Sequence, residues 1–263
     1  GRRVALVIGN DAYQHASPLR NPASDAAAIA AAVKRLGFGH VEVRRNLGTD
    51  AFRRALLDFE AHATGADIAM VFFAGHGIEV DGTNYLIPVD ARLARANGVE
   101  LEAVSLATVT AAISGARKLR LVILDSCRNN PFQPRLLADA GRKRSIGRGL
   151  ARVEPGDNEL VAFAAAAGTV ADDGETGNSP FTVALLKHLE RPGLEVQQLF
   201  RAVRDEVIAA TARGQVPHVY GTLGAEMIYI GSLGPVAAAP AAPKADDGAA
   251  DLITAISGMS DRA

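Results

Sequence analysis

The chain carries the stretch LRLVILDSCRNN at residues 119–130, and this stretch decides the fold. Its first part is dominated by apolar and β-branched side chains, which is typical of a strand buried on both faces of a parallel sheet. The strand leads directly into Asp125, Ser126 and Cys127, which is the only cysteine of the chain. Because ligands and reacting groups in open α/β sheets gather at the carboxyl ends of the strands, we expect Cys127 at the rim of the sheet.

A second apolar run of the same kind, IAMVFFA at residues 68–74, ends in Gly75, His76 and Gly77. If the two strands are neighbours, a thiol and an imidazole meet at one edge of the sheet. The flanking glycines allow close backbone approach and leave an unobstructed amide at Gly77. Taken alone, a single cysteine is most often a small buried apolar residue, and a single histidine is most often a satisfied hydrogen-bonding group. Their positions at strand ends favour a chemical pair.

The composition excludes several classes of protein. Hydrophobic residues make up 48% and charged residues 22% of the 263 residues, which is an ordinary globular balance. The net charge of −1 argues against nucleic acid or a membrane surface as partner. No apolar run reaches the length of about 18 residues that a membrane span needs. One cysteine excludes a disulfide framework and a multi-cysteine metal site.

Alternating strand and helix patterns predict a mostly parallel, doubly wound α/β sheet of about six strands with helices on both faces. The predicted strands lie at residues 3–9, 41–45, 68–74, 119–124 and 159–166, with an antiparallel edge strand at 226–230. The predicted helices lie at residues 24–36 (capped by Ser24), 50–62 (capped by Thr49), 105–114 (opened by Ser105), 180–190 and 195–212. Asp81 and Gly82 between alternating residues predict a hairpin.

Residues 1–231 are expected to form one domain, with a long basic loop of little periodicity at about 129–157 between its larger and smaller parts. The Ala/Pro-rich residues 232–263 read as a linker and tail, beyond which further domains would fit. The first residue is glycine rather than methionine, so an export signal removed from this chain is compatible with the sequence. The compartment, cytoplasmic or exported, stays open, and a soluble protein is expected.

Six motifs in order resemble the caspase-like cysteine peptidases (peptidase C14), most closely the bacterial metacaspase and orthocaspase branch. They are VALVIGN at 4–10 with Tyr13, LRNPASD at 19–25, FAGHG at 73–77, YLIPVD at 85–90, DSCR at 125–128 and NSPFT at 178–182. The resemblance covers roughly residues 3–231, and the histidine precedes the cysteine by about 50 residues, as in caspases.

The resemblance implies a caspase-hemoglobinase fold and peptide hydrolysis by a Cys/His dyad. Cys127 would attack the peptide carbonyl, and His76 would give a proton to the leaving amine. The family's oxyanion donors are backbone amides that map onto Gly77 and Cys127. A third, carboxylate member of the site is neither required nor visible.

Substrate specificity follows from the residue two positions before the nucleophile. The caspase signature is Gln-Ala-Cys, whereas this chain has Asp125 in place of the glutamine. A carboxylate there would repel aspartate at P1, the substrate residue before the cleaved bond, and would pair with arginine or lysine. Residues 19–25 match the first two and the last residue of the metacaspase motif Leu-Arg-Gly-Cys-x-Asn-Asp and lack its cysteine, and the resemblance implies Asp25 as a second acidic wall of the pocket. For both residues the alternative is helix capping or loop hydrogen bonding.

Two loops carry further candidates. The basic loop contains the P1 types that such a pocket accepts, so it is a candidate self-cleavage segment; its alternative is a solvated surface loop. The candidate residues are Arg142, Lys143, Arg144 and Arg148. The acidic loop at residues 172–175 could hold calcium, as in some metacaspases. Because the acidic cluster that a calcium-dependent metacaspase has between the histidine and cysteine strands is reduced here to Glu100 and Glu102, we expect neither calcium nor another metal or cofactor.

The sequence thus predicts a monomeric cysteine endopeptidase that cleaves protein or peptide substrates after arginine or lysine, with self-processing in the basic loop. The alternative is a catalytically silent caspase-fold module that binds or scaffolds other proteins. Presence of both His76 and Cys127 favours the enzyme, because a scaffold needs neither. Nucleotide binding is disfavoured, since no Gly-rich phosphate loop follows the first strand.

Overall fold

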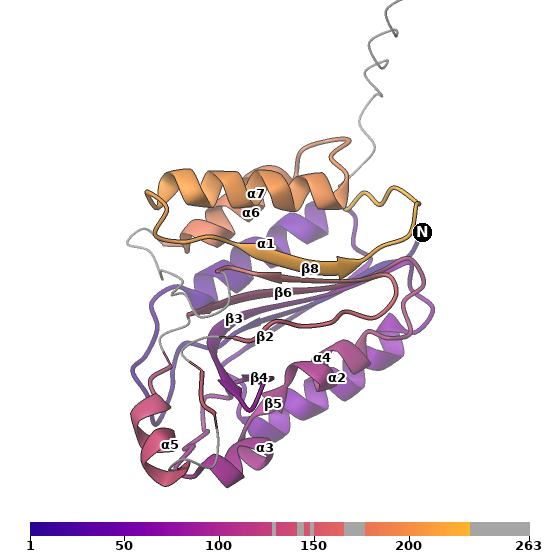
Figure 1. The fold of residues 1–263 in the computed structure, drawn as a ribbon. Coiled ribbons are helices and arrows are strands. Elements are labelled where there is room, and N and C mark those ends of the chain that lie inside the picture. Colours follow the sequence, from indigo (N-terminus) through magenta and orange to yellow (C-terminus); the bar gives the residue numbers. More distant parts are fainter. Residues whose placement is uncertain (128–129, 141–144, 148–149, 166–176, 232–263) are drawn as a thin grey trace, which may run out of the picture.

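A computed structural model describes residues 1–127, 130–140, 145–147, 150–165 and 177–231, and for Cys127 and Ala140 it describes the backbone. The strands are β1 (Arg3–Gly9), β2 (His40–Arg45), β3 (Ile68–Val80), β4 (Thr83–Leu86), β5 (Val104–Ser105), β6 (Leu119–Cys127), β7 (Glu159–Phe163) and β8 (His218–Thr222). They form one sheet in the order β2-β1-β3-β6-β7-β8, with β4 and β5 attached to β3 as a side branch (Figure 1). The strands from β2 to β7 on the main path are parallel, and β8 is antiparallel to β7.

The helices are α1 (Pro22–Arg35), α2 (Thr49–Ala63), α3 (Val99–Glu102), α4 (Leu106–Ala112), α5 (Gln133–Ala140), α6 (Pro180–Leu189) and α7 (Val196–Ala210). Figure 1 shows α1, α6 and α7 on one face of the sheet and α2 and α4 on the other. Alternate residues of β3 and β6 enter two separate apolar cores, one under each helical layer. This layered architecture confirms the predicted α/β fold with a mostly parallel central sheet and helices on both faces.

The predicted hairpin joins β3 to β4. Its turn residues, Asp81 and Gly82, have φ angles of 51° and 80°, which is the left-handed backbone of a tight hairpin turn. Strand β3 is longer than predicted, because it does not end at Ala74 but continues through His76 into the hairpin. The histidine therefore lies within a strand that is paired with β6 up to this residue and with β4 beyond it.

Two predicted helix caps are wrong. Helix α1 begins at Pro22 with Asn21, rather than Ser24, at the N-cap, because the fixed φ of proline suits the first helical turn and its missing N–H group is not needed there. Helix α2 begins at Thr49 itself, with Gly48 at the N-cap. Ser105 does cap α4, since its hydroxyl accepts from the Thr108 amide.

The edge strand predicted at residues 226–230 is also wrong, although the last strand is antiparallel as expected. The edge is β8, and residues 226–230 lie beyond it. Ile228 and Ile230 are buried in the core under α1, α6 and α7. The Val196 amide, at the start of α7, donates to the Ile228 carbonyl over 2.8 Å. The apolar alternation at residues 226–230 therefore reflects burial against helices. A strand pattern alone does not distinguish such burial from pairing in a sheet.

The basic loop is more ordered than its sequence indicated, because α5 lies within it and residues 145–147 pair with the β3–β4 hairpin. Ile146 forms an antiparallel bridge with Val80. The Gly147 amide donates to the Glu79 carbonyl over 3.1 Å, and the Asp81 amide donates to the Ser145 carbonyl over 2.9 Å. We call residues 145–147 the loop strand. Its pairing depends on a partner far away in the sequence, so local periodicity gives no signal for it.

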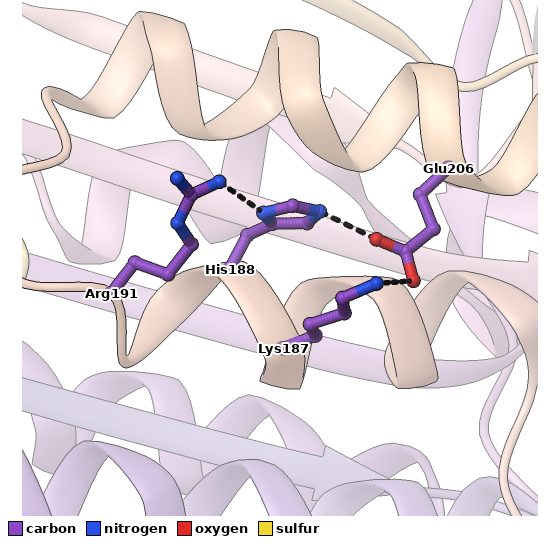
Figure 2. A network of polar contacts seen from close by, with 4 residues as sticks. All are labelled: Lys187, His188, Arg191 and Glu206. Atoms are coloured by element: carbon purple, nitrogen blue, oxygen red, sulfur yellow. Dashed lines mark hydrogen bonds and ion pairs between the residues drawn. The ribbon is translucent and has the colours of Figure 1, made fainter.

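Helices α6 and α7 are joined by a network of polar side chains (Figure 2). The His188 Nε2 atom lies 2.6 Å from Glu206 Oε2, and the Lys187 ammonium donates to Glu206 Oε1 over 2.8 Å. Arg191 lies 3.5 Å from His188 Nδ1. The hydrogen bond from Lys187 lowers the pKa of the Glu206 carboxyl below its ordinary value.

No helix in the described part of the chain is both long and apolar enough to cross a membrane.

Candidate active site

The parallel pairing of β3 with β6 places His76 and Cys127 side by side in the backbone. The two residues are the last pair of the parallel ladder between these strands. Neighbouring strands of a sheet lie about 4.8 Å apart. The His76 imidazole on β3 can therefore reach a group that reacts at Cys127 on β6.

The His76 ring is buried between two aromatic side chains, and the residue is 4% exposed. Its centroid lies 4.4 Å from that of Tyr13 and 6.4 Å from that of Phe132, which meets it edge-on. The Nε2 atom lies 3.2 Å from the Ser17 carbonyl oxygen. A carbonyl oxygen only accepts, so Nε2 carries the proton in this contact, and Nδ1 is the basic nitrogen of the neutral ring.

Tyr13 also holds the backbone at the histidine. The His76 amide donates to the Tyr13 hydroxyl oxygen over 2.7 Å, and that hydroxyl donates to the Ile87 carbonyl over 3.1 Å. A Cβ atom at Gly75 would lie only 2.6 Å from the Tyr13 hydroxyl oxygen, and the φ angle there is +156°. Glycine at this position therefore lets the tyrosine reach the amide of the next residue.

Gly77 follows the histidine and pairs with Leu86 in the hairpin. A Cβ atom at Gly77 would lie 3.1 Å from a methyl carbon of Leu150 and 3.3 Å from the Ser126 Cβ atom. Leu150 is 1% exposed. The residue predicted to donate an oxyanion amide thus packs directly against a side chain that follows the loop strand. The Ser126 hydroxyl is buried with no hydrogen-bond partner among the described residues.

Asp125, two residues before Cys127, is buried at the start of α6. One carboxylate oxygen, Oδ2, accepts from the Thr182 hydroxyl over 2.7 Å and also from the Ser179 hydroxyl. The residue is 6% exposed. Thr182 lies in the first turn of α6 and Ser179 is its N-cap, so the carboxylate faces the positive end of the helix dipole, which stabilises negative charge.

Asp25, in the first turn of α1, meets the same segment. Its Oδ1 atom accepts from the Asn178 side-chain amide over 2.8 Å and from the Ser179 backbone amide over 3.1 Å. The residue is 2% exposed. Both predicted acidic pocket residues therefore take donors from Ser179, one from its hydroxyl and one from its amide. The loop hydrogen bonding considered as an alternative for these residues is present, and it brings the two carboxylates to one place.

The sequence alone predicts no role for the polar residues that surround the carboxylates and the histidine. Asn178, Ser179 and Thr182 lie in the NSPFT motif. The signal in the sequence is the pair of hydroxyl residues, Ser179 and Thr182, three positions apart at a predicted helix start. Ser17 acts through its backbone carbonyl, and a backbone atom leaves no signature in residue type.

The remaining candidates fall largely outside the described residues, including Arg142, Lys143, Arg144 and Arg148 of the basic loop and Asp172, Asp173 and Glu175 of the acidic loop. Among the described residues, no group of three or more His, Cys, Asp or Glu side chains is arranged to hold a metal ion. Glu102 is occupied by backbone amides, since its Oε2 accepts from Arg92 and Leu93.

A buried cysteine strand, a histidine strand beside it and this sheet order define an α/β domain of the caspase class, and the comparisons agree. The caspase domain family (peptidase C14) matches residues 2–228, so the chain belongs to this family of cysteine peptidases. The crystal structure of caspase-1 from Spodoptera frugiperda has the same fold, with a TM-score of 0.61 and 18% identity over 88% of this chain and 90% of that one. No curated protein matches the sequence.

Proposed function

We propose that the protein is a cysteine endopeptidase that cleaves peptide bonds after arginine or lysine, with Cys127 as nucleophile and His76 as its acid–base partner. Membership of the caspase domain family supports peptide hydrolysis in general. The register pairing of His76 with Cys127 supports the choice of these two residues. The proposal includes a metacaspase-like pocket, in which Asp125 and Asp25 bind the basic P1 side chain.

The reaction proceeds by acyl transfer. The Cys127 sulfur attacks the carbonyl carbon of the P1 residue, and the oxygen gains the electron pair while Gly77 and Cys127 amides donate to it. Nδ1 of His76 takes up the thiol proton and gives it to the leaving amine, so that the C–N bond breaks. Water then attacks the thioester carbonyl while His76 takes one of its protons, the C–S bond breaks, and His76 passes that proton to sulfur. The contact of Nε2 with the Ser17 carbonyl holds the ring for these steps.

One observation above all supports a basic P1 residue, namely the meeting of two buried carboxylates at Ser179. Asp125 precedes the nucleophile by two residues of one strand, a distance of about 7 Å. A lysine or arginine side chain spans that distance from the cleaved bond. Two carboxylates attract either cation, and arginine can bind both oxygens of one carboxylate.

The proposal is tested with matched fluorogenic peptides that end in arginine, lysine or aspartate, with wild type beside Cys127→Ala, with and without calcium. Turnover of the basic peptides that disappears in the variant is the expected result, without dependence on calcium. Turnover of the aspartate peptide would leave a peptidase but reject the acidic pocket. No turnover of any peptide by a folded protein would favour the scaffold module instead.

The same specificity extends to self-processing, which we propose for the basic loop. Changing Arg142, Lys143, Arg144 and Arg148 together to Ala should abolish fragments that form in wild type and are absent in Cys127→Ala. Mass spectrometry of intact protein identifies the new ends. An unaltered fragment pattern would place the cut elsewhere.

A further inference from the structure

Ser179 connects three elements that are far apart in the sequence. Its hydroxyl accepts from the Thr182 amide over 2.9 Å, which caps α6. The same hydroxyl donates to Asp125 at the end of β6, and the Ser179 amide donates to Asp25 in α1 over 3.1 Å. One residue therefore satisfies a helix start and both candidate pocket carboxylates at once.

The surroundings of this contact leave little freedom to rearrange. Ser179 and Asp25 are each 2% exposed, and Thr182 is fully buried. Helix α6 is fixed in turn by its apolar core residues Phe181 and Leu185, both fully buried. Because a buried carboxylate needs its hydrogen bonds, loss of one donor changes the direction of the carboxylate rather than being repaired by water.

Arginine and lysine differ in how much they depend on such directions. A guanidinium is a planar fork that binds a carboxylate through two parallel hydrogen bonds, whereas an ammonium is a compact charge with rotating donors. A carboxylate that is turned or mobile therefore weakens arginine binding more than lysine binding. The group that fixes the carboxylates sets the preference between the two.

We propose that Ser179 is a positioning residue that aligns Asp125 and Asp25, and that the hydroxyls of Ser179 and Thr182 thereby determine a preference for arginine over lysine at P1. The inference rests on the proposed function, because it concerns the pocket of that same site. Neither residue touches the reacting atoms. Ser179 acts through both carboxylates, and Thr182 acts through that of Asp125.

The test compares Ser179→Ala with Ser105→Ala, which is a matched control because Ser105 caps α4 by the same contact, accepting from the Thr108 amide over 3.1 Å. Both variants lose a helix cap, but only Ser179→Ala loses a donor to the pocket. The readout is the ratio of kcat/KM for otherwise identical arginine and lysine peptides, with thermal unfolding measured beside it. We expect this ratio to fall by about tenfold in Ser179→Ala and to stay unchanged in Ser105→Ala.

A second pair of variants covers the case in which Ser179→Ala does not fold. Thr182→Val keeps the shape of the side chain and removes the hydroxyl that donates to Asp125, whereas Thr182→Ser keeps the hydroxyl and removes a methyl group. The arginine-to-lysine ratio should fall in the valine variant and persist in the serine variant, even if the serine variant is less stable.

The outcomes separate the inference from the proposed function. Wild type that cleaves both basic peptides, with equal ratios in all folded variants, would overturn the role of Ser179 and leave the peptidase intact. Wild type that cleaves neither basic peptide would overturn both, and that result is read from wild type alone. A shift in KM with little change in kcat would support a role in binding the P1 side chain.

Discussion

The most informative single change is Asp125→Asn, because it removes a charge while keeping the shape of the side chain. The side-chain oxygen of the introduced asparagine, with two lone pairs, can accept from both hydroxyls that now reach Oδ2, those of Ser179 and Thr182. The fold and the α6 start should therefore survive. The variant loses the negative charge offered to a P1 cation, together with its favourable interaction with the α6 dipole.

The size of the effect follows from the kind of contact that is lost. A hydrogen bond to a charged group contributes about 1.5–3 kcal/mol. At about 1.4 kcal/mol for each factor of ten, kcat/KM for an arginine peptide should fall by about 10- to 100-fold. A peptide with citrulline at P1, which has the shape of arginine without its charge, should be cleaved by the variant and by wild type at similar rates.

The control is Asp90→Asn, since Asp90, like Asp125, accepts from a threonine hydroxyl at a helix start; the donor is Thr49 of α2, whose amide also donates to Asp90. It should leave the kinetics of both peptides unchanged. Equal losses on arginine and citrulline peptides in Asp125→Asn would show a general distortion of the site. Unchanged arginine kinetics would remove Asp125 from the pocket.

Three further changes probe the supports of the site. Gly75→Ala places a methyl group against the Tyr13 hydroxyl, so the unfolding free energy should fall by about 1–3 kcal/mol and turnover should fall with it; an unaltered melting curve would contradict the packing described. Leu150→Ala leaves a cavity at a fully buried position, so the unfolding free energy measured in urea should fall by about 2–5 kcal/mol. A fall of less than about 0.5 kcal/mol would contradict this expectation. Glu206→Gln removes a carboxylate whose pKa is lowered by Lys187. At neutral pH, wild type should be more stable than the variant by about 1 kcal/mol or less. This difference in stability should disappear as the pH falls from about 5 to below 4, because the carboxylate is then protonated. Parallel melting profiles of wild type and Glu206→Gln across that range would refute the last expectation.

Much of the fold could be predicted because its central strands are buried on both faces. Apolar runs such as residues 68–74 and 119–124 are typical of strands in the middle of a sheet that is covered on both faces. The hairpin was readable for a local reason, since Asp81 and Gly82 tolerate the left-handed backbone that the turn needs. The histidine and the cysteine could be paired in advance because both follow such strands.

The missed features depend on partners that are distant in the sequence. Ser179 meets Asp125 and Asp25 across 54 and 154 residues, and no periodicity within a window spans such distances. The loop strand was missed for the same reason. The prediction of an edge strand at residues 226–230 is wrong because apolar alternation indicates burial, whereas the hydrogen-bond partner decides between strand and extended coil.

The loop strand has a consequence for a chain that is cut within the basic loop. On one side of residues 141–144, Leu136 of α5 is fully buried in the core below the hairpin. On the other side, Ser145, Ile146 and Gly147 are hydrogen-bonded to the hairpin. Strands β6 and β7, which precede and follow the loop, are neighbours throughout their shared length. The peptide link between them supplies only the entropy of closing one loop, a term that grows slowly with loop length. After a cut in the basic loop, the two fragments should therefore stay together in one folded domain, with the two new chain ends held at different places.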